Sequence, residues 1–261
     1  MIVKTPNRNT NTLSIESNGA YTAQYHDMTL TSVYQPIYDS NNKKIGLEAL
    51  VRATDSTGKS IPPNAIFHNE SIAERDLVNI SNLCQLIHLK NFATARQKSK
   101  KNWLLFLNLS PTCCEDIAIG SINDFYKKRF LRSLNMRANN IIMEFIETPY
   151  DSNYILGVAS QQLKNDGFKV AFDDFSGTDS DHERLSQISP DIVKLDMSLL
   201  NRYMSGDKSP LMRSIKSAKL IGAKTLIEGI ETRDALMSMK KLDIDYFQGY
   251  FLARLEPLKP K

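Results

Sequence analysis

The sequence has few of the features that would place a protein in a membrane or outside the cell. Its longest uninterrupted apolar run, Trp103–Leu107, is far too short to cross a bilayer, and the N-terminus lacks the apolar core of a signal peptide. The 261 residues include only three cysteines, two of them adjacent, so no disulfide framework is indicated. We therefore expect a cytoplasmic protein that is not associated with a membrane.

Three further absences narrow the class of ligand. The formal net charge is only +4, which does not favour binding to a nucleic acid polymer. No glycine-rich phosphate loop follows an early strand, so a dinucleotide-cofactor fold loses its main support. The four histidines follow no metal-ligand spacing, and we interpret them as surface or core residues. The sequence therefore directs attention to its carboxylates.

Short apolar runs alternate with segments of helical spacing along most of the chain. The spacing predicts helices over 76–95, 154–163, 211–221 and 235–242. The apolar runs predict strands over 30–37, 43–50, 103–109, 141–146, 168–175, 192–195, 224–229 and 244–250. Repeated strand–helix units over this length favour a single α/β domain, a closed (β/α)₈ TIM-like barrel, over residues 29–261. Residues 1–28 are polar, and we interpret them as a mobile arm or a short edge element.

Seven of the predicted strands carry a polar side chain at or near their ends. These side chains are Glu48, Asn108, Glu144, the pair Asp173 and Asp174, Lys194, Glu228 and Gln248. Because parallel strands of a barrel end on one face, we expect these groups to gather there. A lysine between apolar residues, such as Lys194, is costly to bury unless carboxylates surround it. The pattern predicts a site for a charged ligand.

The donor atoms in this set are mainly oxygens, which favour Mg²⁺ or Mn²⁺ over Zn²⁺. At a strand end, where the backbone turns, the adjacent Asp173 and Asp174 can both approach one site. Two ions held there would suit in-line displacement at phosphorus. Each residue alone has a simpler interpretation: the aspartate pair as a helix N-cap, and Glu144 as a satisfied core group. The complete series favours the metal site.

The motifs that carry these residues resemble, in order and in approximate spacing, those of the EAL-domain family. The matching segments are Tyr34–Ile37, Glu48–Arg52, Asn108–Ser110, Glu144–Glu147, Asp173–Phe175, Lys194–Asp196, Glu228–Thr232 and Gln248–Tyr250. The resemblance runs from about residue 30 to 257. It implies a (β/α)₈-like barrel with one antiparallel strand, a free-standing domain, and hydrolysis of cyclic di-GMP to linear pGpG with two Mg²⁺ or Mn²⁺ ions.

The resemblance also implies a role for each matched residue. Glu48, Asn108, Glu144 and Asp173 would hold one ion, and Asp173, Asp174 and Glu228 the other. Glu228 would act as general base, and Lys194 would position water and phosphate. The substrate would contact Gln35, Leu50, Arg52 and Gln248, and Glu147 would anchor the loop that follows Asp174. The implied partners are cyclic di-GMP, a second copy in a homodimer and a regulatory protein.

One segment, 176–181, departs from the family. Where the family usually has glycines, this chain has Ser176 and Thr178, which restrict the backbone. Asp179 and Asp181 add negative charge near the expected substrate. We expect this loop to be strained or mobile and to weaken the second metal site rather than the first.

Two alternatives to hydrolysis of cyclic di-GMP remain open from the sequence. A catalytically weak or silent member of the family would bind cyclic di-GMP or a protein partner instead. A barrel phosphodiesterase for another phosphodiester would have the same chemistry, but it would not explain the full series of motifs. The complete set of ligand residues favours the enzyme.

Overall fold

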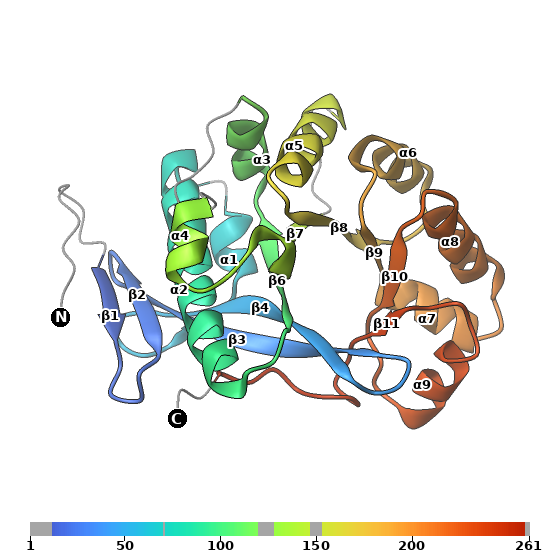
Figure 1. Cartoon of the computed structure of the whole chain (residues 1–261), viewed down its shortest axis with the longest axis horizontal. Helices are drawn as coiled ribbons and strands as arrows, with labels where there is room; N and C mark the ends of the chain where they lie inside the picture. The colour runs from blue at the N-terminus through green and yellow to red at the C-terminus, as the bar shows by residue number, and fades with distance from the viewer. Residues whose placement is uncertain (1–11, 70, 120–127, 147–152, 259–261) are drawn as a thin grey trace.

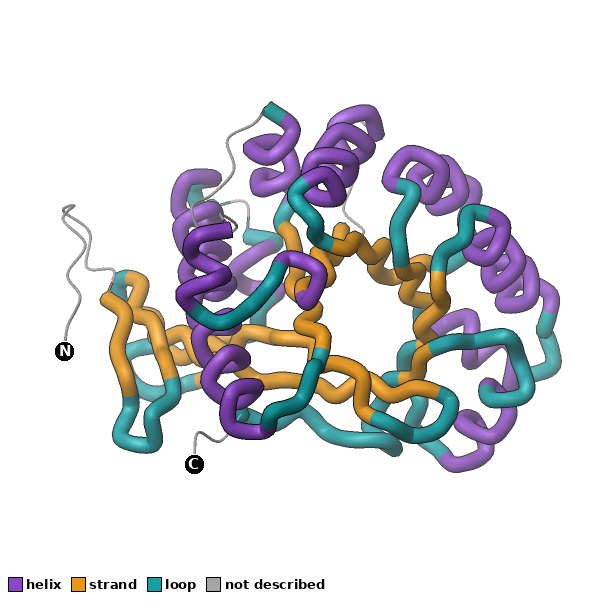
Figure 2. Tube along the Cα trace, in the orientation of Figure 1, coloured by secondary structure: helices purple, strands orange, loops and turns teal. Residues whose placement is uncertain are grey.

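The computed structural model describes residues 12–69, 71–119, 128–146 and 153–258. Eight strands form a closed barrel with helices outside it, as Figures 1 and 2 show. Around the barrel the order is β3, β11, β10, β9, β8, β7, β6 and β4, and pairing of β3 with β4 closes the ring. The predicted (β/α)₈ architecture is therefore confirmed.

The barrel strands are β3 (Met28–Asp39), β4 (Lys44–Thr54), β6 (Leu104–Leu109), β7 (Ile141–Phe145), β8 (Lys169–Phe175), β9 (Ile192–Leu195), β10 (Lys224–Ile227) and β11 (Tyr246–Phe247). A short strand, β5 (Ser60–Ile61), pairs antiparallel with the end of β4. The α-helices are α1 (Asn64–Phe67), α2 (Glu74–Ser99), α3 (Pro111–Ala118), α4 (Lys128–Ser133), α5 (Asn153–Asn165), α6 (Asp179–Ile188), α7 (Met197–Met204), α8 (Ser209–Leu220) and α9 (Arg233–Met239). A 3₁₀ turn, η2 (Ala138–Asn140), precedes β7. Within these residues, none of the helices combines the length and hydropathy that crossing a bilayer requires.

Strand β3 is the antiparallel member of the barrel. It pairs antiparallel with both β4 and β11, whereas the other neighbouring pairs of the barrel are parallel. A tight turn joins β3 to β4, and the carboxylate of Asp39 stabilises it by accepting from the backbone N–H groups of Asn41 and Lys43. A turn this short can only join antiparallel strands, since parallel neighbours need a crossover. The expectation of one antiparallel strand is confirmed.

The described part of the N-terminal arm is a hairpin of β1 (Thr12–Ile15) and β2 (Tyr21–Tyr25). Strand β2 pairs antiparallel with the start of β3 and so extends the same sheet. The hydroxyl of Tyr25 donates to Asp76 on α2 at 2.5 Å. Of the two interpretations from the sequence, residues 12–25 therefore match the short edge element.

One layer of the barrel interior, which we call the floor, is filled by one apolar side chain from each of six strands. This cluster consists of Ile37, Phe106, Ile142, Ala171, Ile192 and Leu226. On β4, Gly46 occupies the equivalent place, where a Cβ would lie 2.9 Å from the carbonyl oxygen of Leu104 and 3.1 Å from the Phe106 ring. The floor is thus apolar and closely packed, and it closes the barrel beneath the residues that follow.

The alternation of side chains along each strand determines which residues point into the barrel above this floor. Side chains two residues apart on a strand point to the same face. The residues two positions beyond the floor on β4, β6, β7, β8, β9 and β10 are therefore also directed inward. They are Glu48, Asn108, Glu144, Asp173, Lys194 and Glu228.

The predicted helices are present, with ends that differ by a few residues, but the sequence periodicity missed the short helices α1, α3 and α4 as well as α6 and α7. In α6 only Asp181, Leu185 and Ile188 are buried, so its apolar stripe is too thin to give a helical period. Helix α7 is only 8 residues long and starts directly after β9, where Asp196 caps it by accepting from the N–H of Ser198. Both helices follow strands of the site, and their first turns lie near it.

Candidate active site

The ammonium group of Lys194 lies at the centre of a cluster of carboxylates. Its Nζ atom is 2.6 Å from Asp173, 2.9 Å from Glu144, 2.9 Å from Glu228 and 3.3 Å from Glu48. These residues come from five barrel strands or their ends, and inward alternation brings them together. The gathering of these strand-end residues at one face, predicted from the sequence, is confirmed.

Burial changes the proton affinity of two groups in this cluster. Loss of solvent raises the pKa of Glu144, which is fully buried, well above its usual value, although Lys194 opposes the shift. For Lys194 itself desolvation lowers the pKa, but the surrounding carboxylates outweigh it and hold the pKa well above its usual value. The lysine is therefore charged, and its positive charge opposes the rise in the pKa of Glu144 and Glu228.

Glu228 is the most accessible carboxylate of the cluster. Its side chain is 19% exposed, compared with 0% for Glu144. Burial by the barrel wall raises the pKa of Glu228 to about 8, against the opposing charge of Lys194. A carboxylate with this pKa exchanges a proton near neutral pH, which is the property required of an acid or base in catalysis.

Asp174 reaches the same face as Asp173 because the backbone leaves the regular strand there. Its φ of 53° is left-handed, and the pairing of β8 with β9 shifts between Phe172 and Phe175. On an ideal strand the two aspartates would point to opposite faces. The side chain of Asp174 is exposed at the mouth, whereas Asp173 is buried.

Two groups of carboxylates have the geometry of cation sites. In each group the oxygens lie within 4.8 Å of one another; the groups are Glu48 with Glu144 and Asp173, and Asp173 with Asp174 and Glu228. Neither oxygen of Glu144 accepts a well-formed hydrogen bond, although both are buried. An all-oxygen set with an unsatisfied buried carboxylate fits hard divalent cations. The two groups share Asp173.

Amide side chains complete the rim of the cluster. The Nε2 atom of Gln248 donates to Glu48 at 2.6 Å and to Oε1 of Gln35 at 3.2 Å. Asn108 lies opposite Glu144 in the β6–β7 pairing, so its side chain is directed toward the same interior. The structure therefore brings Gln35, Asn108 and Gln248 to the site, as the sequence predicted.

A pocket of about 1050 Å³ opens from the cluster toward α1 and α2. Leu50 and Arg52 line it, because they alternate with Glu48 on the same face of β4, which continues to Thr54. The guanidinium of Arg52 donates to its neighbour's backbone at Val51, and the side chain is half-buried. The pocket is large enough for a dinucleotide-sized ligand to reach the carboxylates.

Helix α2 supplies pocket residues that the sequence analysis missed. Ser81, Gln85 and His88 are buried and line the pocket. Gln85 donates to the backbone carbonyl of Asn108 at 3.2 Å, and thereby holds the end of β6 in place. A polar stripe at positions i, i+4 and i+7 of an otherwise amphipathic helix is a signal that could have identified them.

Comparison with known proteins agrees with this geometry. The sequence profile of the EAL domain matches residues 20–255. The chain belongs to the EAL-domain family. It is 30% identical over 236 residues to the cyclic di-GMP phosphodiesterase PdeA of Borreliella burgdorferi. That alignment covers 87% of this chain and 34% of the relative. The probable cyclic di-GMP phosphodiesterase PdeI of Escherichia coli is 28% identical over 86% of this chain and 29% of the relative. The chain thus spans about a third of these relatives.

The fold of this EAL domain also matches solved structures. The YkuI protein of Bacillus subtilis, in complex with cyclic di-GMP and calcium, superposes with a TM-score of 0.73 at 23% identity, over 87% of this chain and 56% of that protein. At this level of identity the match supports the barrel fold.

The segment 176–181 of this EAL domain is neither strained nor irregular. Ser176 and Thr178 are not among the residues with positive φ, so the glycines they replace are not needed for this backbone. The required left-handed residue is Gly177, at φ 82°, where a Cβ would lie 2.8 Å from Oγ of Ser214. The expected strain at Ser176 and Thr178 is therefore wrong for this fold.

Asp181 holds this segment in place from the first turn of α6. One of its carboxylate oxygens accepts from the N–H and hydroxyl of Ser176 and from the N–H of Thr178, at 2.9–3.0 Å. Thr178 in turn caps α6 by accepting from the N–H of Asp181, which completes a capping box. These hydrogen bonds to its charged form lower the pKa of Asp181, although burial opposes them. The charged carboxylate of Asp181 therefore accepts hydrogen bonds from the loop instead of facing the pocket. Glu147, which was expected to anchor this loop, lies outside the described residues.

Proposed function

We propose that this protein hydrolyses cyclic di-GMP to linear pGpG, using two Mg²⁺ or Mn²⁺ ions at the mouth of the barrel. The observation that carries the proposal is the pair of carboxylate groups that share Asp173, directly beneath a pocket of dinucleotide size. Membership of the EAL-domain family and the names of the relatives supply the substrate.

The four ligands proposed for the first ion are Glu48, Asn108, Glu144 and Asp173, and those for the second are Asp173, Asp174 and Glu228. When bound, the ions would activate a water molecule and neutralise charge that develops on the phosphate. The Klebsiella pneumoniae protein BlrP1 matches this fold with a TM-score of 0.69 at 24% identity, over 87% of this chain and 56% of that protein. Its structure is a complex with manganese and cyclic di-GMP, which supports a metal of this type in such a barrel.

The residues of the chain itself carry the remaining steps. Glu228 accepts the proton of the attacking water, a role supported by its exposure at the mouth of the barrel. Lys194, fixed by four carboxylates, positions the water and offsets charge on the phosphate. Arg52 binds a phosphate of the substrate, while Gln35, Leu50 and Gln248 contact the rest of the nucleotide.

Incubation of the purified chain with cyclic di-GMP and Mn²⁺, followed by chromatography of the nucleotides, tests the proposal. We expect pGpG to accumulate, and Glu48→Ala to lower the rate by about a hundredfold or more with little change in melting temperature, because mouth residues of a barrel serve function more than stability. Replacement of Mg²⁺ by Ca²⁺ should inhibit, since Ca²⁺ prefers longer bonds and more ligands.

Binding of cyclic di-GMP without any turnover would instead support the alternative, a silent receptor. The loop that suggested this alternative is held by Asp181 in a regular capping arrangement, which favours the enzyme. Equal turnover by Glu48→Ala and the parent chain would contradict the metal assignment. The homodimer, a regulatory protein partner, the cytoplasmic location and the anchoring role of Glu147 stay predictions.

A further inference from the structure

A second cavity lies at the opposite end of the barrel from the carboxylate cluster. It has a volume of about 960 Å³ and is formed by the segments that lead into β6, β7 and β8. Its walls come from the end of α2, the residue Asn102 before β6, the α4–η2 connection, and the end of α5 with Gly167. The catalytic side chains sit at the other ends of these same strands, so the two cavities are separate.

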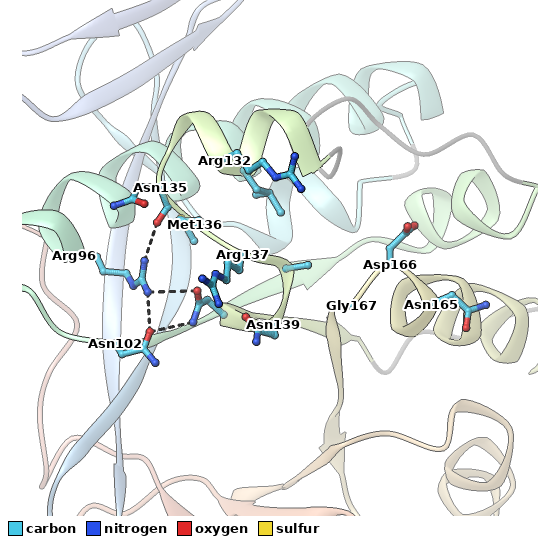
Figure 3. Close-up of a pocket in the computed structure, with 13 residues that line it drawn as sticks. Arg96, Asn102, Arg132, Asn135, Met136, Arg137, Asn139, Asn165, Asp166 and Gly167 are labelled. Atoms are coloured by element: carbon cyan, nitrogen blue, oxygen red, sulfur yellow. Dashed lines mark hydrogen bonds between the residues drawn. The ribbon is translucent and has the colours of Figure 1, made fainter.

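The lining of this cavity is mixed, with somewhat more polar than apolar surface, and it carries excess positive charge. Three arginines, Arg96, Arg132 and Arg137, line it, against one carboxylate, Asp166. Figure 3 shows Asp166 beside Gly167 at the side of the cavity away from Arg96. The amide side chains of Asn102, Asn135, Asn139, Asn140 and Asn165 complete the polar lining.

The guanidinium of Arg96 is held by neutral oxygens only. It donates to the carbonyl of Asn135 at 3.0 Å and to the side-chain oxygens of Asn102 at 2.7 Å and Asn140 at 3.3 Å, as the dashed lines in Figure 3 show. Its Nε atom is buried and has no hydrogen-bond partner. Within the described ranges no carboxylate forms an ion pair with Arg96, Arg132 or Arg137. A half-buried cation that no described carboxylate pairs with contributes a positive potential to the cavity.

A purely structural role explains only part of this arrangement. Arg96 does tie the end of α2 to the segment before β7. The exposed Arg132 and Arg137, however, add positive charge to the same cavity and stabilise no neighbouring carboxylate. Like charges gathered in this way repel one another unless an anion lies among them.

We propose that this cavity binds a phosphate-bearing anion of about the size of a mononucleotide. Guanidinium groups match phosphate oxygens in geometry as well as charge, which makes arginine the usual side chain for phosphate recognition. Asparagine amides offer both a donor and an acceptor, so Asn139 and Asn165, which are exposed at the cavity, can contact a base or ribose. The volume suits a small molecule and exceeds what a single phosphate needs.

Calorimetric titration of the full, metal-depleted chain tests this proposal without using hydrolysis. The probes are inorganic phosphate, GMP and guanosine. We expect both phosphate-bearing probes to bind and guanosine to bind at least tenfold more weakly than GMP. Tighter binding of GMP than of inorganic phosphate would assign the site to nucleotides, and equal binding would assign it to phosphate alone; both results support an anion site.

Variants locate the binding. The double substitution Arg132→Ala with Arg137→Ala should weaken GMP binding about tenfold or more, whereas Arg132→Lys with Arg137→Lys should retain much of it because the charge remains. The matched control is Arg129→Ala, because Arg129 lies on α4 with Arg132 but does not line the cavity. A second variant, Arg52→Ala, reports on binding at the catalytic mouth. Both should bind GMP as the parent chain does.

Two results would overturn the proposal. The first is no binding of either phosphate-bearing probe by a parent chain that melts cooperatively. The second is binding that survives the double alanine substitution but is lost in Arg52→Ala, which would place the anion at the catalytic mouth. Neither result depends on whether the protein hydrolyses cyclic di-GMP.

Discussion

At the scale of single residues, Lys194 determines how the catalytic face is charged. Four carboxylates surround one ammonium group, so negative charge is in excess. The raised pKa values of Glu144 and Glu228 show that protons compensate part of this excess in the metal-free protein. Divalent cations can replace those protons, which connects metal binding to the protonation of the site.

Removal of the Lys194 charge should therefore destabilise the metal-free protein. Lys194→Met keeps the length of the side chain but leaves buried carboxylates without a counter-charge, and such a change costs about 3–5 kcal/mol. We expect a clear fall in the free energy of unfolding in urea, and a smaller fall when Mn²⁺ is present because the ions supply positive charge.

Lys216→Met, an exposed substitution on α8, serves as the control for the loss of a lysine. An equal loss of stability for Lys194→Met with and without Mn²⁺ would argue against cations among these carboxylates.

His88 is a second buried group whose protonation state matters. Its Nδ1 atom lies 2.7 Å from Oγ of Ser32, and desolvation lowers the pKa of His88 to about 3. In the unfolded chain the pKa is near 6.5, so the unfolded state binds the proton more readily between these two values. The stability that neutral His88 allows is present above about pH 6.5 and is lost as the pH falls toward 3.

Replacement of His88 should make the protein less sensitive to acid. Between pH 6.5 and 5 the buried histidine costs the parent chain about 2 kcal/mol, at roughly 1.4 kcal/mol per pH unit. We expect the loss of unfolding free energy from pH 7 to pH 5 to be smaller in His88→Asn by about that amount. His26→Asn, at an exposed histidine, should keep the acid sensitivity of the parent chain. Identical pH dependence in His88→Asn and the parent would show that His88 is not buried in its neutral form.

At the scale of elements, the connection from β8 to α6 combines a strand end, a pair of proposed metal ligands and a helix cap in nine residues. Asp173 and Asp174 lie just before the end of the strand at Phe175, Gly177 makes the left-handed turn, and Asp181 bonds back to the backbone of Ser176. The position of Asp174 therefore depends on hydrogen bonds made by the helix that follows it.

Loss of the Asp181 carboxylate should loosen this connection. We expect Asp181→Ala to raise the Mn²⁺ concentration required for half-maximal turnover, because Asp174 is then less well held, and to cost about 1–2 kcal/mol of stability from the lost cap. Metal titrations of turnover beside thermal melting measure the two effects separately.

Asp179→Ala is the matched control, since Asp179 is exposed in the same first turn of α6 and makes no bond to Ser176. If Asp181→Ala lowers stability but leaves the metal dependence unchanged, the carboxylate acts only as a helix cap.

At the scale of the whole molecule, closure of the barrel is what brings the proposed metal ligands together. Glu48 and Glu228 are 180 residues apart in the sequence and lie against the same ammonium group. A ligand set of this kind cannot form in the unfolded chain, so binding of the ions must stabilise the folded state.

Addition of Mn²⁺ should accordingly raise the free energy of unfolding. At a free concentration about a hundredfold above the dissociation constant, the expected gain is about 2.7 kcal/mol. Calorimetric or fluorescence melting over a series of Mn²⁺ concentrations measures it. Asp173→Asn, which alters the residue shared by the two carboxylate groups, should abolish most of the gain. A full gain in this variant would place the ion elsewhere.

Local sequence patterns were enough to predict the barrel strands and the barrel class, and they selected the candidate site residues. Apolar runs identified every barrel strand, and the polar groups within them identified Glu48, Glu144, Asp173, Lys194 and Glu228, because these patterns are local and survive without knowledge of the fold. The antiparallel β3 came from the family resemblance, and the tight turn after Asp39 gives its physical reason.

How these groups interact depends on tertiary packing and could not be predicted from the sequence. The four contacts of Lys194, the elevated pKa of Glu228 and the uncompensated charge of Arg96 all depend on burial and on partners distant in sequence. The interpretation of Asp181 differs for the same reason. From the sequence we expected a negative charge near the substrate, whereas in the fold this carboxylate accepts from backbone N–H groups. Composition reveals which charges are present, and packing decides what each one faces.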